Sequence, residues 1–141
     1  MKALNLADNF SYLDVDDNAV FDIIAAVREG IKFGVFTKLA AKFPFSLTEW
    51  SVFLHLSERT IQRYKKEKRT FDPIQSEKIL EITLLYKKGV EVFGNTDRFN
   101  SWLEATNVAL GNVKPKNLLD NTFGINLLKD ELIRIEHGVL A

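Results

Sequence analysis

The sequence predicts an all-α protein built from two helical lobes. Apolar residues recur at helical spacing from end to end, strand-like alternation is nowhere sustained, and residues that start or stop helices stand between the apolar segments. A chain of 141 residues is long enough to bury an ordinary hydrophobic core. We expect an acidic segment over residues 1–16, a first lobe over residues 17–94 and a second lobe over residues 95–141.

Two helices are expected at the start of the first lobe, over residues 17–28 and 33–42. Asp17 can cap the first helix and Gly30 can end it. Pro44 closes the second helix, because the residue before a proline avoids helical angles. The second helix has an apolar face rich in Phe and Leu. The buried face of the first helix is expected to consist of Val20, Phe21, Ile24 and Val27.

Two capping boxes mark the next helix starts. Ser46 stands three residues before Glu49, and Asp72 stands three residues before Gln75. Pro73 strengthens the second start, which predicts a long helix over residues 73–93. One stripe of that helix is expected to contain Ile79, Ile82 or Thr83, Tyr86, Val90 and Phe93.

The second lobe is expected to contain three helices, over residues 97–110, 115–119 and 123–137. Gly94-Asn95-Thr96 before it is typical of a stop and a short linker. The first of these helices would present Phe99, Trp102, Ala105 or Thr106, and Ala109 on one face. The last would bury Ile125, Leu128, Leu132 and Ile135. Gly138 would end it and leave a short apolar tail, residues 139–141.

Charge is distributed unevenly along a chain whose formal net charge is zero. Residues 1–25 contain one lysine and five aspartates. Residues 58–69 contain six basic residues and two acidic ones. The neutral total therefore conceals a concentrated basic patch.

The basic patch adjoins a spacing that is typical of a helix-turn-helix. Such a motif needs apolar residues at fixed points, so that two short helices pack crosswise, and a small residue where they touch. Ser51 is the small residue, Ser57 can cap the second helix, and His55 occupies the turn position often taken by glycine, where φ is positive. The apolar points are Trp50, Leu54, Leu56, Ile61 and Tyr64.

The second helix of this motif would carry the DNA contacts. Its outward stripe is expected to place four side chains against base edges, namely Arg59, Gln62, Arg63 and Lys66. Four others suit phosphates, namely Thr60, Lys65, Lys68 and Arg69. The alternative is that residues 58–69 form only a solvated, charged helix.

Several other classes of function find no support in the sequence. Without cysteine there are no disulfides or thiolate metal sites, and two histidines cannot complete a metal ligand set. No catalytic motif or cofactor-binding motif is present, so we expect neither an enzyme nor a cofactor. No signal peptide or membrane-spanning segment is apparent, and we expect a cytoplasmic protein.

The residues from Ser57 to Arg63 resemble the recognition helix of the Xre/MbcA/ParS family of antitoxins. The stretch 102–138 resembles that family's toxin-binding domain. The matching motifs are Trp102-Leu103, Asn107 to Gly111, Pro115 with Leu118-Leu119-Asp120, Gly124, and Leu132 to Gly138. His55 in the turn, and Tyr64-Lys65-Lys66 in place of a more Arg-rich stretch, depart from the family pattern.

The resemblance implies an antitoxin of a type II toxin–antitoxin system, with an Xre-like helix-turn-helix lobe and a small toxin-binding lobe. Its partners would be a RES-domain toxin that consumes NAD and the operator DNA of its own operon, and the antitoxin would act as a homodimer. The implied toxin-binding residues are Arg134, Ile135, Gly138, Val139, Leu140 and Ala141. The tail would cover the active-site cleft of the toxin.

Two alternatives remain at this point. One is a stand-alone transcriptional regulator whose second lobe serves for dimerisation or sensing. The other is an antitoxin that has lost DNA binding and acts only as a protein inhibitor.

Overall fold

Helices account for the regular structure of the computed structural model, which describes residues 17–138. Within that range there are isolated β-bridges but no strand, so the all-α prediction is confirmed. The α-helices are α1 (Asp17–Glu29), α2 (Phe33–Ala40), α3 (Leu47–Leu54), α4 (Glu58–Glu67), α5 (Pro73–Phe93), α6 (Thr96–Glu104) and α7 (Thr122–Glu136). Two short 3-10 helices are η2 (Val108–Leu110) and η3 (Pro115–Leu118).

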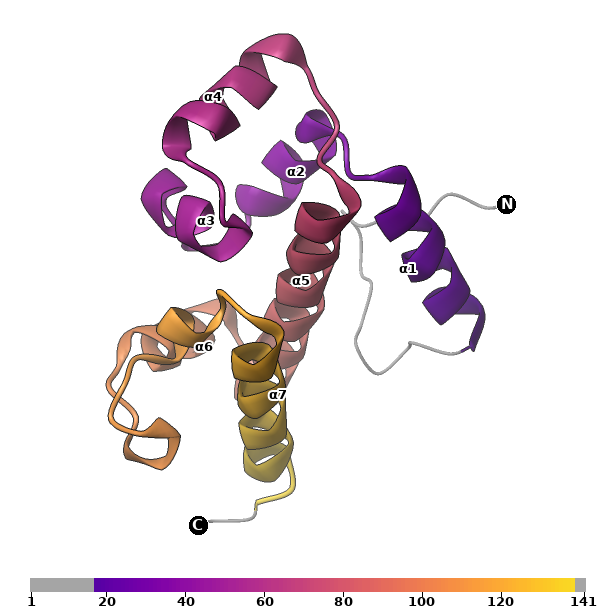
Figure 1. Cartoon of the computed structure of the whole chain (residues 1–141). Helices are drawn as coiled ribbons and strands as arrows, with labels where there is room; N and C mark the ends of the chain where they lie inside the picture. The colour runs from indigo at the N-terminus through magenta and orange to yellow at the C-terminus, as the bar shows by residue number, and fades with distance from the viewer. Residues whose placement is uncertain (1–16, 139–141) are drawn as a thin grey trace.

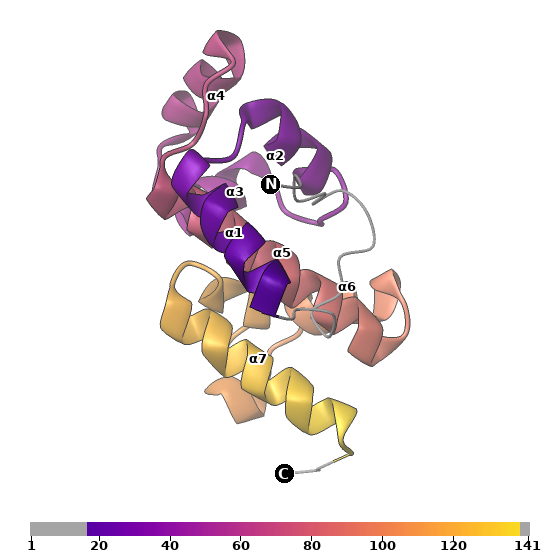
Figure 2. The same ribbon diagram turned by 90° about the vertical axis from the view of Figure 1, so that its right-hand side faces the viewer.

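Helix α5 is the central element of the fold. Pro73 stands at its start, and Gly94 ends it with a left-handed φ of 84°. Helices α1, α3, α6 and α7 all pack against it. Figures 1 and 2 show α4 at one end of the molecule and the C-terminal end of α7 at the other.

Packing on several sides explains why α5 buries more than the one stripe that its sequence predicts. Ile79, Ile82, Thr83 and Tyr86 are buried as expected, but Leu80 and Leu85 on other faces are buried as well. Val90 and Phe93 are only partly buried.

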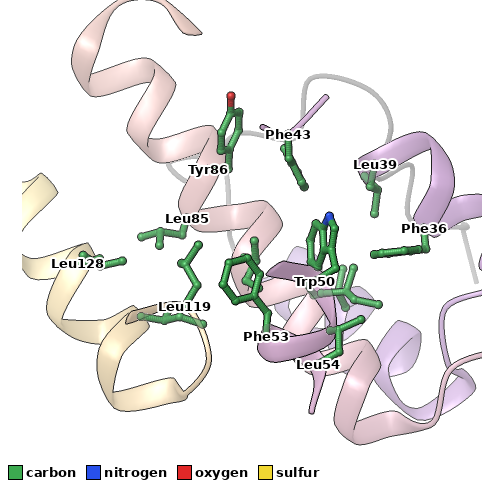
Figure 3. Close-up of a cluster of buried hydrophobic side chains, with 14 of the residues drawn as sticks. Phe36, Leu39, Phe43, Trp50, Phe53, Leu54, Leu85, Tyr86, Leu119 and Leu128 are labelled. Atoms are coloured by element: carbon green, nitrogen blue, oxygen red, sulfur yellow. The ribbon is translucent and has the colours of Figure 1, made fainter. Parts of the chain in front are cut away.

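An aromatic cluster joins α2 and α3 to α5 (Figure 3). The ring of Trp50 meets that of Phe36 edge to face, with 5.0 Å between centroids. The ring of Phe43 lies 4.6 Å from that of Tyr86 on α5. Edge-to-face and tilted pairs of this kind add to the stabilisation that comes from burial alone. The same core continues without a break to Leu128 of α7.

The predicted buried face of α1 is wrong in three of its four residues. Phe21 is 67% exposed, and Val20 and Ile24 are exposed too. Val27 packs against the core as expected, but its companions there are Ile23 and Ala26. Because apolar residues lie on more than one side of this helix, periodicity alone does not select the side that faces α5.

The helix expected over residues 97–110 is also shorter than predicted, because α6 ends at Glu104. Ala105 adopts extended angles, and the Asn107 backbone N–H donates a hydrogen bond to the Val113 carbonyl oxygen at 2.9 Å. This local pairing accompanies the end of the helix before the separate turn η2. Ala105, Thr106 and Ala109 are consequently exposed, and the buried residues are Phe99, Leu103 and Leu110.

The other helix boundaries agree with the sequence to within two residues, although the helix expected over 115–119 is the 3-10 helix η3, and one cap differs. The Asp72 side chain makes no capping hydrogen bond, so the second capping box is absent although Pro73 begins α5. In the last helix, Leu128 and Leu132 are fully buried, while Ile135 is only half-buried. Residues 1–16 and 139–141, and the side chain of Asp17, lie outside the part of the chain that the structure describes.

Candidate functional site: a basic helix and a C-terminal lobe

Local sequence sets the geometry of α3, the turn and α4. Ser46 and Glu49 form the predicted capping box: the Glu49 N–H donates to the Ser46 hydroxyl at 3.1 Å, and the Ser46 N–H donates to Glu49 Oε1 at 3.0 Å. Ser57 caps α4 by accepting a hydrogen bond from the Thr60 N–H. Between the two helices, His55 has a φ of 55°, which is the left-handed conformation expected at the turn.

The apolar points of the helix-turn-helix pack as the sequence predicts. Trp50, Leu54 and Ile61 are buried, while Leu56 and Tyr64 are partly buried against the same core. Because the apolar face of α4 packs against the core, its polar face is exposed to solvent.

The exposed face of α4 carries the residues predicted to contact DNA. The exposed members are Arg59, Gln62, Arg63, Lys65, Lys66, Lys68 and Arg69. Two residues have other contacts. The Thr60 hydroxyl accepts a hydrogen bond from Ser57, and the Arg69 guanidinium lies over the Tyr64 ring at 4.9 Å. Within residues 17–138, the basic residues of this face that form no ion pair are Arg59, Arg63, Lys65, Lys66 and Lys68.

Both ends of α3 are tied to the segment that precedes α7. At the C-terminal end, the His55 ring nitrogen Nε2 donates a hydrogen bond to the Asp120 carbonyl oxygen at 2.7 Å. Near the N-terminal end, the Lys116 ammonium of η3 lies 2.7 Å from the Glu49 carboxylate and also binds Glu104 of α6. Sequence inspection missed the two contacts with α3, because their paired residues are more than 60 positions apart in the chain.

The ion pairs that Lys116 forms with Glu104 and Glu49 shift the pKa of the Lys116 and Glu49 side chains. Burial raises the pKa of Glu49, but hydrogen bonds from Lys116 and from the Ser46 backbone outweigh it, and the pKa is lowered from its ordinary value of 4.5. Hydrogen bonds to Glu104 and Glu49 raise the pKa of Lys116 above 10.5. Both shifts favour the charged forms that make the bridge.

An ion pair between a buried lysine and an exposed glutamate fixes the C-terminal end of α7. Lys88 of α5 is only 3% exposed, and its ammonium lies 2.8 Å from both carboxylate oxygens of Glu136. Lysine is rarely buried without such a partner. The pair holds the last turn of α7 against α5. No pattern in the sequence predicts this ion pair, because Lys88 is one more polar residue on a long helix.

Beyond that pair lie the residues that the family resemblance assigns to toxin binding. Arg134 is exposed and forms an ion pair with Glu131 at 3.4 Å. Ile135 is half-buried, and Gly138 is exposed with a φ of 68°. Val139, Leu140 and Ala141 lie outside the described residues.

The described residues contain no group of three or more His, Cys, Asp or Glu side chains placed to hold a metal ion. Over the same residues, no helix is both long enough and apolar enough to cross a membrane.

Two family models match the chain in sequence order. The model for the antitoxin Xre-like helix-turn-helix domain matches residues 22–83, and the model for the antitoxin Xre/MbcA/ParS C-terminal toxin-binding domain matches residues 88–138. A comparison with curated proteins returned no match. The two matched segments meet within α5 and together span most of the chain. The chain therefore belongs to the Xre/MbcA/ParS-type antitoxins, with an Xre-like helix-turn-helix domain followed by a toxin-binding domain.

Proposed function

We propose that this antitoxin neutralises a RES-type, NAD-consuming toxin by covering the toxin's active site with its C-terminal lobe and tail, and that it represses its own operon through α4. The observation that carries the proposal is the placement of the two surfaces. The cationic face of α4 and the end of α7 lie at opposite ends of the molecule, separated by the length of α5 (Figure 1). One chain can therefore hold DNA and a toxin at the same time.

The toxin-binding surface proposed here consists of Arg134, Ile135, Gly138 and the tail over residues 139–141. The Lys88–Glu136 ion pair anchors the last turn of α7, so the residues that follow leave from a fixed point. An apolar tail that starts at a fixed point loses less conformational entropy when it enters a cleft than one that starts from a mobile helix end.

Co-expression with the toxin of the adjacent gene tests this mechanism. We expect the full chain to co-purify with the toxin and to keep cellular NAD at its normal level. Deletion of residues 139–141 should leave the complex intact but let NAD fall. A deletion variant that protects NAD as well as the full chain does would rule out the tail as the blocking element.

The DNA-binding part of the proposal rests on α4 entering the major groove as a recognition helix. Binding to the duplex upstream of the operon is measured by titration at fixed salt. The same preparation tests the stand-alone regulator hypothesis, because such a regulator would bind DNA but would not co-purify with a toxin.

We further propose that the DNA-bound form is a homodimer, whose two α4 helices contact half-sites about one helical turn apart. Sedimentation of the free protein and of the DNA complex gives the stoichiometry. A 1:1 complex on the minimal duplex would contradict the dimer and leave toxin neutralisation unaffected.

A further inference from the structure

A groove next to the recognition helix is lined by lysines from two separate segments. It has a volume of about 470 Å³ and lies between the start of α2 and the end of α4. Lys32 and Lys38 line one side, and Lys65 and Lys68 line the other. No acidic side chain lines it, and none of the four lysines has an ion-pair partner among residues 17–138.

Backbone hydrogen bonds hold the two sides of the groove together. The Phe33 N–H donates to the Arg69 carbonyl oxygen at 3.0 Å, and the Phe71 N–H donates to the Ile31 carbonyl oxygen at 2.8 Å. These bonds flank an antiparallel bridge between Lys32 and Thr70. The Ile31 N–H is held in turn by the buried hydroxyl of Ser76. The lysines of α2 are therefore brought beside those of α4 by tertiary structure rather than by chance orientation of their side chains.

Four lysine side chains line one concave surface together with Phe33 and Val35, so positive charge is concentrated around it, and a bound anion would reduce the mutual repulsion of the lysines. Lysine binds phosphate as a point charge, with three hydrogen-bond donors and no acceptor. The backbone at Gly34, at the start of α2, is open as well, because a Cβ added there would meet no atom within 4 Å. The groove thus suits an extended, repeating anion that needs no base-specific contact.

The position of the groove indicates which anion that is. Lys65 lines it from the side of α4 that adjoins the outward stripe, where Gln62 is the neighbouring residue three positions earlier. A recognition helix in the major groove lies between two phosphate backbones. The backbone that passes this side of α4 would run over the start of α2.

We propose that this groove binds the phosphodiester backbone of DNA beside the bases contacted by α4, and that Lys32 and Lys38, which lie outside the two helices α3 and α4 of the helix-turn-helix motif, extend the DNA interface. The inference rests on the proposed DNA binding by α4. It adds a second contact surface and two residues that no recognition-helix pattern includes.

The test compares three variants of the full chain by the salt dependence of their DNA affinity. Lys32→Ala/Lys38→Ala removes two phosphate contacts and should reduce the slope of log K against log salt by about 2, to the same extent on operator and on unrelated duplexes. Lys32→Arg/Lys38→Arg should keep the wild-type slope. Arg98→Ala/Lys114→Ala removes the same charge from exposed positions of the C-terminal lobe and should keep the slope too.

Phosphate-ethylation interference locates the contact. We expect phosphates at the flank of the site to interfere with binding of the wild type but not of the Lys32→Ala/Lys38→Ala variant. If the wild type binds DNA and the double alanine variant shows the same slope and the same interfering phosphates, the groove is not a DNA surface and the role of α4 stands. If the wild type binds no DNA, both proposals are wrong. Equal melting temperatures show that the exposed substitutions leave the fold intact.

Discussion

His55 has two structural roles at one position. Its backbone takes the left-handed conformation of the helix-turn-helix turn, and its side chain holds the Asp120 carbonyl oxygen in the segment before α7. A left-handed conformation costs a non-glycine residue about 1–2 kcal/mol, whereas a net hydrogen bond contributes about 1 kcal/mol. The free-energy cost of the backbone strain and the stabilisation from the hydrogen bond are thus of similar size at His55.

Two substitutions at His55 separate these effects. His55→Ala removes the bond and keeps the strain, and it should lower the free energy of unfolding by about 1 kcal/mol. His55→Gly removes both and should be close to wild type, because glycine adopts positive φ without strain. Urea denaturation measures both values. Equal destabilisation by the two variants would contradict the strain assigned to the turn.

Gly89 is required for the close approach of α5 and α6. A Cβ added to it would overlap the ring of Phe99, which is itself buried. Gly89→Ala should therefore destabilise the protein by about 1–3 kcal/mol through overpacking. Thermal or urea unfolding provides the measurement.

Gly34 provides the matched control, because it is also helical but has open space at its Cβ position. Gly34→Ala should stabilise by up to about 1 kcal/mol, since alanine restricts the unfolded chain and favours helix. A similar loss of stability in both variants would show that the contact with Phe99 is not the cause.

At the scale of elements, α4 is an amphipathic helix with one buried face and one polar, solvent-exposed face. Ile61 packs into the core, while the stripe of Arg59, Gln62, Arg63 and Lys66 is left in solvent. The sequence predicts these two faces, because its apolar and basic residues recur at helical spacing on different sides of the helix. Cap residues are similarly local signals, and they placed the starts of α3 and α4 correctly.

Two substitutions on α4 distinguish base contacts from phosphate contacts. Arg63→Ala should weaken binding to the operator by about 1–3 kcal/mol and leave binding to unrelated duplexes less affected. Lys68→Ala should weaken both alike and lower the salt slope by about 1. Titrations on both duplexes at several salt concentrations measure this difference. Small and equal effects of the two substitutions would mean that α4 does not enter the major groove.

At the scale of the whole molecule, Lys116 links the two family domains. It joins Glu49 of α3 to Glu104 of α6, and His55 makes a second connection to the same segment. Together with the shared helix α5, these contacts make the two matched domains parts of one continuous core.

The Glu49–Lys116 ion pair makes the free energy of unfolding depend on pH, and the pKa shifts of the two groups give the direction of that dependence. The pKa of Glu49 is lowered in the folded state. The contribution of this carboxylate to stability is therefore fully present above pH 4.5, its ordinary pKa, and is lost as the pH falls below that value. The pKa of Lys116 is raised, so its contribution is lost only as the pH rises above 10.5.

Glu49→Gln tests the loss of stability at low pH. It keeps the capping box, since glutamine also serves at that position. At pH 7 the variant should be less stable than wild type by about 1 kcal/mol or less, as expected of a partly exposed pair. The difference should shrink as the pH falls from 5 to 3. Urea midpoints across that range measure it, and a constant difference would contradict the assigned role of the carboxylate charge.

The sequence by itself determined the all-α class, most helix boundaries, the helix-turn-helix and the exposed basic stripe. These features depend on residues within one or two helical turns of each other, so caps, prolines and periodicity are sufficient to specify them. It did not determine which side of α1 is buried or where α6 ends. The buried side of α1 depends on packing against α5, and the end of α6 depends on the backbone pairing of Asn107 with Val113, which no cap, proline or apolar spacing in the sequence signals.

Only the tertiary structure decided which distant charges meet. The lysines of α2 and α4 share a groove, Lys116 reaches Glu49, and Lys88 binds Glu136. Each of these groups is an ordinary polar residue in the linear sequence. Their roles follow from the folding of the chain around α5, which brings residues about 30 to 70 positions apart within contact.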